Sequence, residues 1–220
     1  MHSLLSRIRG AIFDLDGTLI DSMGVWEQVD VDFLAQHGFD CDPSYTRAVG
    51  SMHYEEAATY TIARYGLQMT KQQVLDAWMD MAIHAYGNTI ALKPHARALL
   101  MACKENQIKL ALATASPSTL YEPVLRRHGL LEVFDAIVTT ADVTRSKGFP
   151  DIYELAAQRI GVLPKQCAVF EDILAGIQGA NAAGAITVAV YDHASCEDWE
   201  EMRRQACYAL RDFAILLKRQ

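Results

Sequence analysis

The hydrophobic residues of this chain occur in short, nearly continuous runs rather than in alternation with polar residues. Such runs are typical of strands with both faces buried, as in a parallel sheet covered by helices. Helical patterns follow the runs, and three of them end at Gly129, Gly161 and Gly184, where a residue without Cβ suits the left-handed C′ position. The pattern predicts an α/β fold with a doubly wound parallel sheet. The expected strands are residues 11–15, 108–113, 136–139, 168–170 and 186–190.

A helical stretch interrupts this pattern between the first and second expected strands. A connection of about 70 residues is far longer than the two to six residues usual for a βα loop. We therefore expect two domains: an α/β core of residues 1–21 and 93–220, and a helical cap domain of residues 22–92. The tryptophans of the cap are expected in its core. The expected cap helices contain Trp26, Val29 and Phe33, then residues 53–65, then Val74, Trp78, Met81 and Ala85 after a capping box that begins at Thr70.

Composition and charge exclude several classes of protein. The chain has 220 residues, 51% of them apolar and 21% charged, which excludes a disordered or fibrous protein. The net charge of −7 provides no basic field for nucleic acid or an anionic membrane. The five cysteines lack metal-ligand spacing and are expected as free thiols. Because no signal-peptide pattern and no apolar run of ~18 residues occurs, we expect a soluble, cytoplasmic protein.

Polar residues collect where the expected strands end. Asp14 and Asp16 follow the first strand, Thr114 and Ala115 follow the second, and Lys147 follows the third. The fourth strand is followed by Glu171 and Asp172. In a doubly wound sheet, ligands bind just beyond the carboxyl ends of the strands. We therefore expect these side chains to converge on one site.

The residue types at this edge indicate phosphoryl transfer. Crowded carboxylates repel one another unless a divalent cation lies among them, and such oxygen ligands suit Mg²⁺. Asp14 and Asp172 are the natural ligands. Lys147 and the Thr114 hydroxyl would neutralise and hydrogen-bond a substrate phosphate. A carboxylate can also act as the nucleophile, and a second carboxyl two residues later can protonate the leaving oxygen and then activate water.

Four motifs in order make the sequence resemble the haloacid dehalogenase-like superfamily, in its phosphatase branch with a helical cap after the first strand. The resemblance covers the whole chain. Two positions depart from the family pattern: Gly148 stands where the family has proline, and Ile173 where it has serine. The motifs are D-x-D-G-T at residues 14–18, a Ser or Thr at Thr114, K-P-x-P-D-I-Y at residues 147–153, and E-D-S-x-x-G-I at residues 171–177.

This resemblance implies roles for individual residues. Asp14 matches the nucleophile, and Asp16 matches the general acid/base, whose backbone carbonyl also binds Mg²⁺. Thr114 and Lys147 complete the catalytic set, and Ala115 joins them in binding the phosphate. In the cap, family members place substrate contacts in the stretch that here holds Arg47, Ser51, Met52, His53 and Tyr54; Arg47 and His53 are the expected contacts. The expected metal-binding residues are Asp14, Asp16, Glu171 and Asp172.

The expected function is that of a Mg²⁺-dependent phosphatase, acting on a small phosphorylated metabolite through an aspartyl phosphate. A sugar-phosphate mutase of the β-phosphoglucomutase type would share every core residue. Mutases of that type carry a cap histidine near the position of Trp26, where this chain has none nearby. A phospho-accepting receiver module is an alternative from another class, but it leaves the helical insertion unexplained. The sequence does not indicate an oligomeric state.

Overall fold

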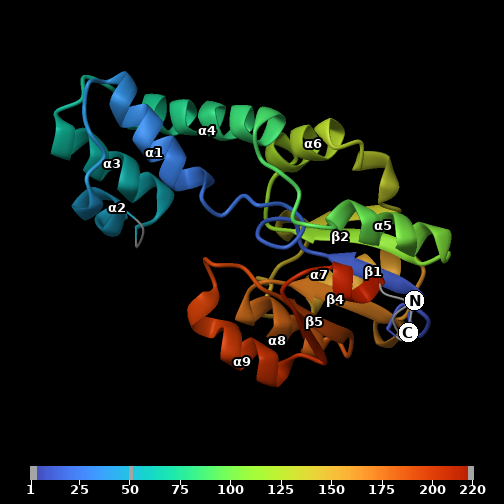
Figure 1. Cartoon of the computed structure of the whole chain (residues 1–220). Coiled ribbons are helices and arrows are strands. Elements are labelled where there is room, and N and C mark those ends of the chain that lie inside the picture. Colours follow the sequence, from blue (N-terminus) through green and yellow to red (C-terminus); the bar gives the residue numbers. More distant parts are fainter. Residues whose placement is uncertain (1–3, 50–51, 218–220) are drawn as a thin grey trace. The chain divides into compact units, whose positions relative to one another are not determined.

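The structure, a computed structural model, describes residues 4–49 and 52–217. The chain folds into two compact units. Unit 1 comprises Met1–Ser22 and Ala91–Gln220, and unit 2 comprises Met23–Ile90. The chain therefore leaves unit 1 after Ser22 and re-enters it at Ala91 (Figure 1).

Within the described part of unit 1, six parallel strands form one sheet in the order β3-β2-β1-β4-β5-β6 (Figure 1). The predicted doubly wound α/β fold is confirmed. The sixth strand was missed because it is three residues long and only its last residue is buried. The strands are β1 (Gly10–Phe13), β2 (Lys109–Thr114), β3 (Ala136–Thr139), β4 (Cys167–Glu171), β5 (Ile186–Val190) and β6 (Tyr208–Leu210).

Helices cover both faces of this sheet (Figure 1). Helix α5 packs on β2 and on α10, whereas α7 packs on β1, β2 and β3, and α8 packs on β4 and β5. Gly129, Gly161 and Gly184 all have positive φ angles, which confirms their predicted role at helix ends. The helices are α5 (Ala96–Glu105), α6 (Ser118–Arg127), α7 (Asp151–Arg159), α8 (Leu174–Ala182), α9 (Trp199–Gln205) and α10 (Ala214–Leu217). The 3₁₀ turns are η1 (Leu131–Val133), η2 (Thr140–Asp142), η3 (Pro164–Gln166) and η4 (Cys196–Asp198).

The register between β1 and β4 determines which residues meet at the carboxyl edge. Phe13 pairs with Phe170, and their fully buried rings stack with centroids 4.3 Å apart. The next residues along the two strands are Asp14 and Glu171, and the Asp14 amide donates to the Phe170 carbonyl at 3.0 Å. Parallel pairing therefore places two carboxyl groups side by side. The strand order also reverses here, which is where doubly wound folds bind ligands.

All regular elements among the described residues of unit 2 are helices. Helices α1 and α3 both pack on α4. The Thr70 amide donates to Gln73 Oε1 at 2.8 Å, and the Gln73 amide donates back to the Thr70 hydroxyl, which confirms the predicted capping box at the start of α4. The helices are α1 (Val25–Gln36), α2 (Pro43–Val49), α3 (Tyr54–Tyr65) and α4 (Lys71–Asn88). No helix in the described ranges has both the length and the apolar character needed to cross a bilayer.

Two details of the cap helices differ from the prediction. Trp26 is 39% exposed rather than part of the core, because the buried stripe of α1 runs instead through Val25, Val29 and Phe33. Its ring meets Tyr54 edge-on, with centroids 5.6 Å apart. The buried stripe of α4 recurs every four residues, through Val74, Trp78, Ala82 and Tyr86, so Met81 and Ala85 are only half-buried.

Candidate active site

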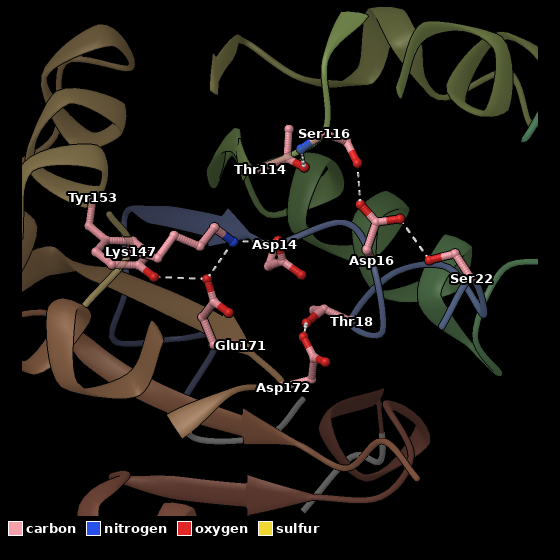
Figure 2. Close-up of polar contacts among 10 residues, drawn as sticks. All are labelled: Asp14, Asp16, Thr18, Ser22, Thr114, Ser116, Lys147, Tyr153, Glu171 and Asp172. Atoms are coloured by element: carbon pink, nitrogen blue, oxygen red, sulfur yellow. Dashed lines mark hydrogen bonds and ion pairs between the residues drawn. The ribbon is translucent and has the colours of Figure 1, made fainter. Parts of the chain in front are cut away.

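Four of the predicted residues meet at the carboxyl edge of the sheet in unit 1. Asp14 follows β1, Glu171 ends β4 and Asp172 comes next, all nearly inaccessible to solvent. Lys147 reaches them from the loop between η2 and α7 and is also buried. Its ammonium forms an ion pair with Asp14 Oδ1 and donates to Glu171 Oε1 at 2.7 Å (Figure 2). The Lys147 ammonium therefore lies between the carboxylates of Asp14 and Glu171.

A tight turn after β1 brings a further hydroxyl to this group. Gly17 has a φ of 79°, which a residue without Cβ adopts at little cost, and its amide donates to the Ile20 carbonyl at 3.0 Å. The turn directs Thr18 toward the end of β4, where its hydroxyl donates to Asp172 Oδ1 at 2.9 Å (Figure 2). The Asp16-Gly17 pair therefore forms the turn that brings Thr18 into the site.

The three carboxyl groups are close enough to bind one ion. Asp14, Glu171 and Asp172 each offer an oxygen, and these oxygens lie within 4.8 Å of one another. Glu171 Oε2 and Asp172 Oδ2 are buried without a hydrogen-bond partner among the described residues. A buried, unpaired carboxylate oxygen is costly unless a proton or a cation compensates it.

Burial and mutual repulsion change the acidity of every group in this cluster. Burial raises the pKa of Asp172 to about 9, and the charges of Asp14 and Glu171 add to the effect. Burial raises the pKa of Glu171 to about 7 and also raises the pKa of Asp14, although Lys147 opposes both shifts. Burial alone would lower the pKa of Lys147, but the two carboxylates beside it outweigh burial and raise it. Lys147 therefore stays charged.

The charge balance and the donor types fit a divalent cation. With all three carboxyl groups ionised, one ammonium would leave two negative charges uncompensated, and this is the form that a bound divalent cation favours. A divalent ion would balance them, and hard oxygen ligands of this kind suit Mg²⁺ or a similar ion. The two unpartnered oxygens of Glu171 and Asp172 are available as ligands. The structure thus supports a divalent metal site formed by Asp14, Glu171 and Asp172.

Asp16 lies outside this carboxylate cluster. Its two carboxylate oxygens accept hydrogen bonds from Ser22 at 2.7 Å and from Ser116 at 2.6 Å (Figure 2). Thr114 is fully buried, and its hydroxyl accepts from the Ser116 amide at 3.0 Å, whereas Ala115 is exposed beside it. Two hydroxyls therefore hold the Asp16 side chain near the end of β2, and its charge still raises the pKa of Asp14. Metal binding through the Asp16 backbone carbonyl stays a prediction.

The predicted cap residues lie in unit 2. Arg47 belongs to α2 and His53 precedes α3 as its N-cap residue, and both side chains are exposed. Tyr54 begins α3 and is 38% exposed, and Met52 is half-buried. Ser51 lies outside the described residues. The role of these residues in binding substrate stays a prediction.

Several site residues are not predicted by the sequence pattern. Thr18 and Tyr153 are letters of the matched motifs, and each donates a hydrogen bond to one of the metal-site carboxylates. Ser22 and Ser116 carry no signal beyond their closeness to motif residues. Gly176 is also a letter of a matched motif, and a Cβ there would come within 2.4 Å of the Glu171 side chain. The motifs contained three of these five residues, but the contacts themselves required the fold.

The chain is similar to known proteins in sequence and in fold. A family model described as haloacid dehalogenase-like hydrolase matches residues 8–184. Hexitol phosphatase B of Escherichia coli (strain K12) is 30% identical over 187 residues, covering 84% of this chain and 84% of that protein. Fructose-1-phosphate phosphatase YqaB of the same strain is 29% identical over 199 residues, covering 85% and 98%. The structure of CbbY from Rhodobacter sphaeroides in complex with phosphate matches with a TM-score of 0.74 and 25% identity, covering 95% of this chain and 96% of that one.

Proposed function

The chain belongs to the haloacid dehalogenase-like hydrolases and is a phosphate-monoester hydrolase, and from this premise we propose that it acts on small phosphorylated sugars or polyols with Mg²⁺ as its cofactor. The observation that carries the proposal is a buried group of three carboxyl groups and one ammonium at the carboxyl edge of the sheet: Asp14, Glu171, Asp172 and Lys147. The substrate class rests on the hexitol and fructose 1-phosphate named for the two relatives.

In the proposed first step, a carboxylate oxygen of Asp14 attacks the phosphorus atom. The bond from phosphorus to the substrate oxygen breaks, and the leaving alkoxide takes a proton from Asp16. Lys147 stays charged and compensates the negative charge around Asp14, while Thr114 and Ala115 bind the phosphoryl oxygens. A divalent cation held by Asp14, Glu171 and Asp172 would favour the ionised form of the nucleophile and neutralise charge on the phosphoryl group.

In the second step, Asp16 accepts a proton from water. The water oxygen attacks the phosphorus atom of the aspartyl phosphate, inorganic phosphate leaves, and the Asp14 carboxylate is restored. Asp16 thus returns to the protonated state in which the cycle began. We propose that the helical unit of residues 22–92 acts as a cap domain, with Arg47 and His53 contacting the organic part of the substrate.

The test is an assay of inorganic phosphate release by the purified full chain. Hexitol phosphates, fructose 1-phosphate and non-sugar phosphate monoesters would be compared with Mg²⁺ and with EDTA. We expect many turnovers on sugar and polyol phosphates, loss of activity with EDTA, and recovery when Mg²⁺ is restored. An isomerised sugar phosphate in place of free phosphate would indicate a mutase. A single phosphorylation without turnover would indicate a receiver.

The variant Asp14→Asn tests the nucleophile. An amide does not form the acyl phosphate, so we expect kcat to fall by more than about 10³, which corresponds to about 4 kcal/mol of barrier. Asp198→Asn changes an exposed carboxyl in η4 and is the matched control, with kcat unchanged. If folded Asp14→Asn protein kept more than a tenth of the normal rate, Asp14 would not be the nucleophile.

A further inference from the structure

Tyr153 makes a contact that the proposed chemistry does not use. Its side chain is 1% exposed, and its hydroxyl donates to Glu171 Oε1 at 2.8 Å (Figure 2). The same oxygen accepts from the Lys147 ammonium at 2.7 Å. The other carboxylate oxygen, Oε2, is buried and unpartnered among the described residues. Tyr153 and Lys147 therefore both donate to Oε1 of Glu171, and Oε2 remains available to another ligand.

Two glycines of α8 lie directly against this arrangement. A Cβ at Gly176 would lie 2.4 Å from Glu171 Cδ and 2.5 Å from Oε2, so the carboxylate rests directly on the glycine backbone. A Cβ at Gly179 would lie 2.0 Å from the Lys147 carbonyl oxygen and 3.0 Å from the Tyr153 ring. The close approach of α8 therefore restricts both the Glu171 side chain and the Tyr153 ring.

We propose that Tyr153 is a positioning residue for the metal site, acting through Glu171. Its hydroxyl fixes the rotation of the Glu171 carboxylate, so that Oε1 orients Lys147 and Oε2 remains available to a cation shared with Asp14 and Asp172. The inference rests on the proposed function only in requiring a divalent cation at these carboxylates. Partners that orient metal ligands typically change metal affinity by about 10- to 100-fold when they are removed.

A buried tyrosine hydroxyl could also contribute to stability alone, and unit 2 provides a matched control for that role. Tyr45 is fully buried, and its hydroxyl bonds with Thr61 at 2.8 Å, as Tyr153 does with Glu171. Tyr45 and Thr61 belong to unit 2, whereas all candidate metal ligands belong to unit 1. Tyr45→Phe therefore removes a comparable hydroxyl without changing the cluster.

The experiment measures Mg²⁺ binding to the metal-free full chain by calorimetry and by the increase in Tm that Mg²⁺ produces. We expect Tyr153→Phe to weaken Mg²⁺ binding about tenfold and to recover most of its kcat at saturating Mg²⁺. Tyr45→Phe should lower the metal-free Tm and keep the normal Mg²⁺ affinity. In a Glu171→Ala background, Tyr153→Phe should cause no further loss of affinity, because its effect passes through Glu171.

A second variant, Gly176→Ala, disturbs Glu171 from the other side and should also weaken Mg²⁺ binding. Asp172→Asn tests the metal site itself. Normal Mg²⁺ affinity in folded Tyr153→Phe, together with a loss in Asp172→Asn, would overturn the positioning role and leave the proposed function intact. Normal affinity in Asp172→Asn would overturn the metal site and, with it, the role of Tyr153. An equal loss from Tyr153→Phe with and without Glu171 would also contradict the inference.

Discussion

Asp16 differs from the other carboxylates of the site in what surrounds it. Asp14, Glu171 and Asp172 are buried against Lys147 and one another, whereas Asp16 accepts hydrogen bonds from the hydroxyls of Ser22 and Ser116. Carboxyl groups in different surroundings suit different tasks, with one group as nucleophile and another exchanging protons. The different surroundings of Asp16 therefore support its assignment as general acid/base.

The assignment predicts that Asp16→Asn acts differently on different leaving groups. General acid assistance is typically worth ~10² to 10⁴ and matters most for a strongly basic leaving group. Formation of the phosphoenzyme should therefore slow far more with an alkyl phosphate than with p-nitrophenyl phosphate. Hydrolysis of the phosphoenzyme should slow equally for both substrates, since both form the same phosphoenzyme. Rapid-quench measurements separate the two steps, and equal losses in the first step would remove Asp16 from the acid role.

The raised pKa of Asp30 predicts that the stability of the fold depends on pH, independently of the active site. Burial among the cap helices raises the pKa of Asp30 to about 6, although the Tyr45 hydroxyl, 3.2 Å away, opposes the shift. A raised native pKa means that the folded state holds the proton more tightly than the unfolded chain does. The stability contributed by protonated Asp30 is therefore complete below about pH 4 and is lost as the pH rises through about 6.

Replacement by asparagine removes this titration. Asp30 is partly exposed, so solvent reduces the effect, and we expect the stability of Asp30→Asn relative to wild type to rise by about 1 kcal/mol between pH 4 and pH 7.5. Urea denaturation at the two pH values measures the difference. Asp32→Asn, which changes an exposed aspartate of the same helix, is the control. A difference that stayed constant with pH would show that Asp30 titrates normally.

At the scale of elements, hydrophobic periodicity predicts the positions of the long helices correctly. It predicts less accurately which of their residues are buried. Thr70 and Gln73 mark the start of α4 because their bonds are local and do not depend on the rest of the fold. The prediction placed Trp26 in the core because Val29 and Phe33 follow it by three and seven residues and because large apolar residues are usually buried. In the structure, α1 packs on α4 and buries Val25, whereas Trp26 is partly exposed.

The capping box gives a prediction at this scale. Thr70→Ala removes the acceptor for the Gln73 amide and should lower the free energy of unfolding by about 1 kcal/mol. Thr70→Ser keeps the hydroxyl oxygen and should lie within a few tenths of a kcal/mol of wild type. Chemical denaturation measures both variants, and phosphatase activity should not change in either. Equal stability of the alanine and serine variants would contradict the capping role.

At the scale of the whole molecule, the candidate catalytic residues and the predicted specificity residues lie in different units. All candidate catalytic and metal-binding residues belong to unit 1, and the predicted specificity residues Arg47 and His53 belong to unit 2. If this division holds, Arg47→Ala and His53→Ala should change the ranking of sugar phosphates by about tenfold in kcat/KM, while the rate on p-nitrophenyl phosphate changes little.

A substrate panel measured with Mg²⁺ in excess tests this division. Lys71→Ala, an exposed change at the start of α4, is the control and should leave the ranking unchanged. A uniform fall across every substrate, the aryl phosphate included, would mean that Arg47 and His53 act in folding or catalysis. The specificity assignment would then be wrong.

The sequence by itself determined the sheet, its helices and the family, because these depend on local periodicity and on residue types at strand ends. The motifs also placed Asp14, Lys147, Glu171 and Asp172 in one site, since parallel strands end at a common edge. What those residues contact was decided by tertiary structure alone. The bonds from Ser116 to Asp16 and from Tyr153 to Glu171 span 100 and 18 residues of sequence, and the contact of Glu171 with Gly176 depends on how closely α8 approaches the sheet. Such contacts follow from packing, which no local pattern records.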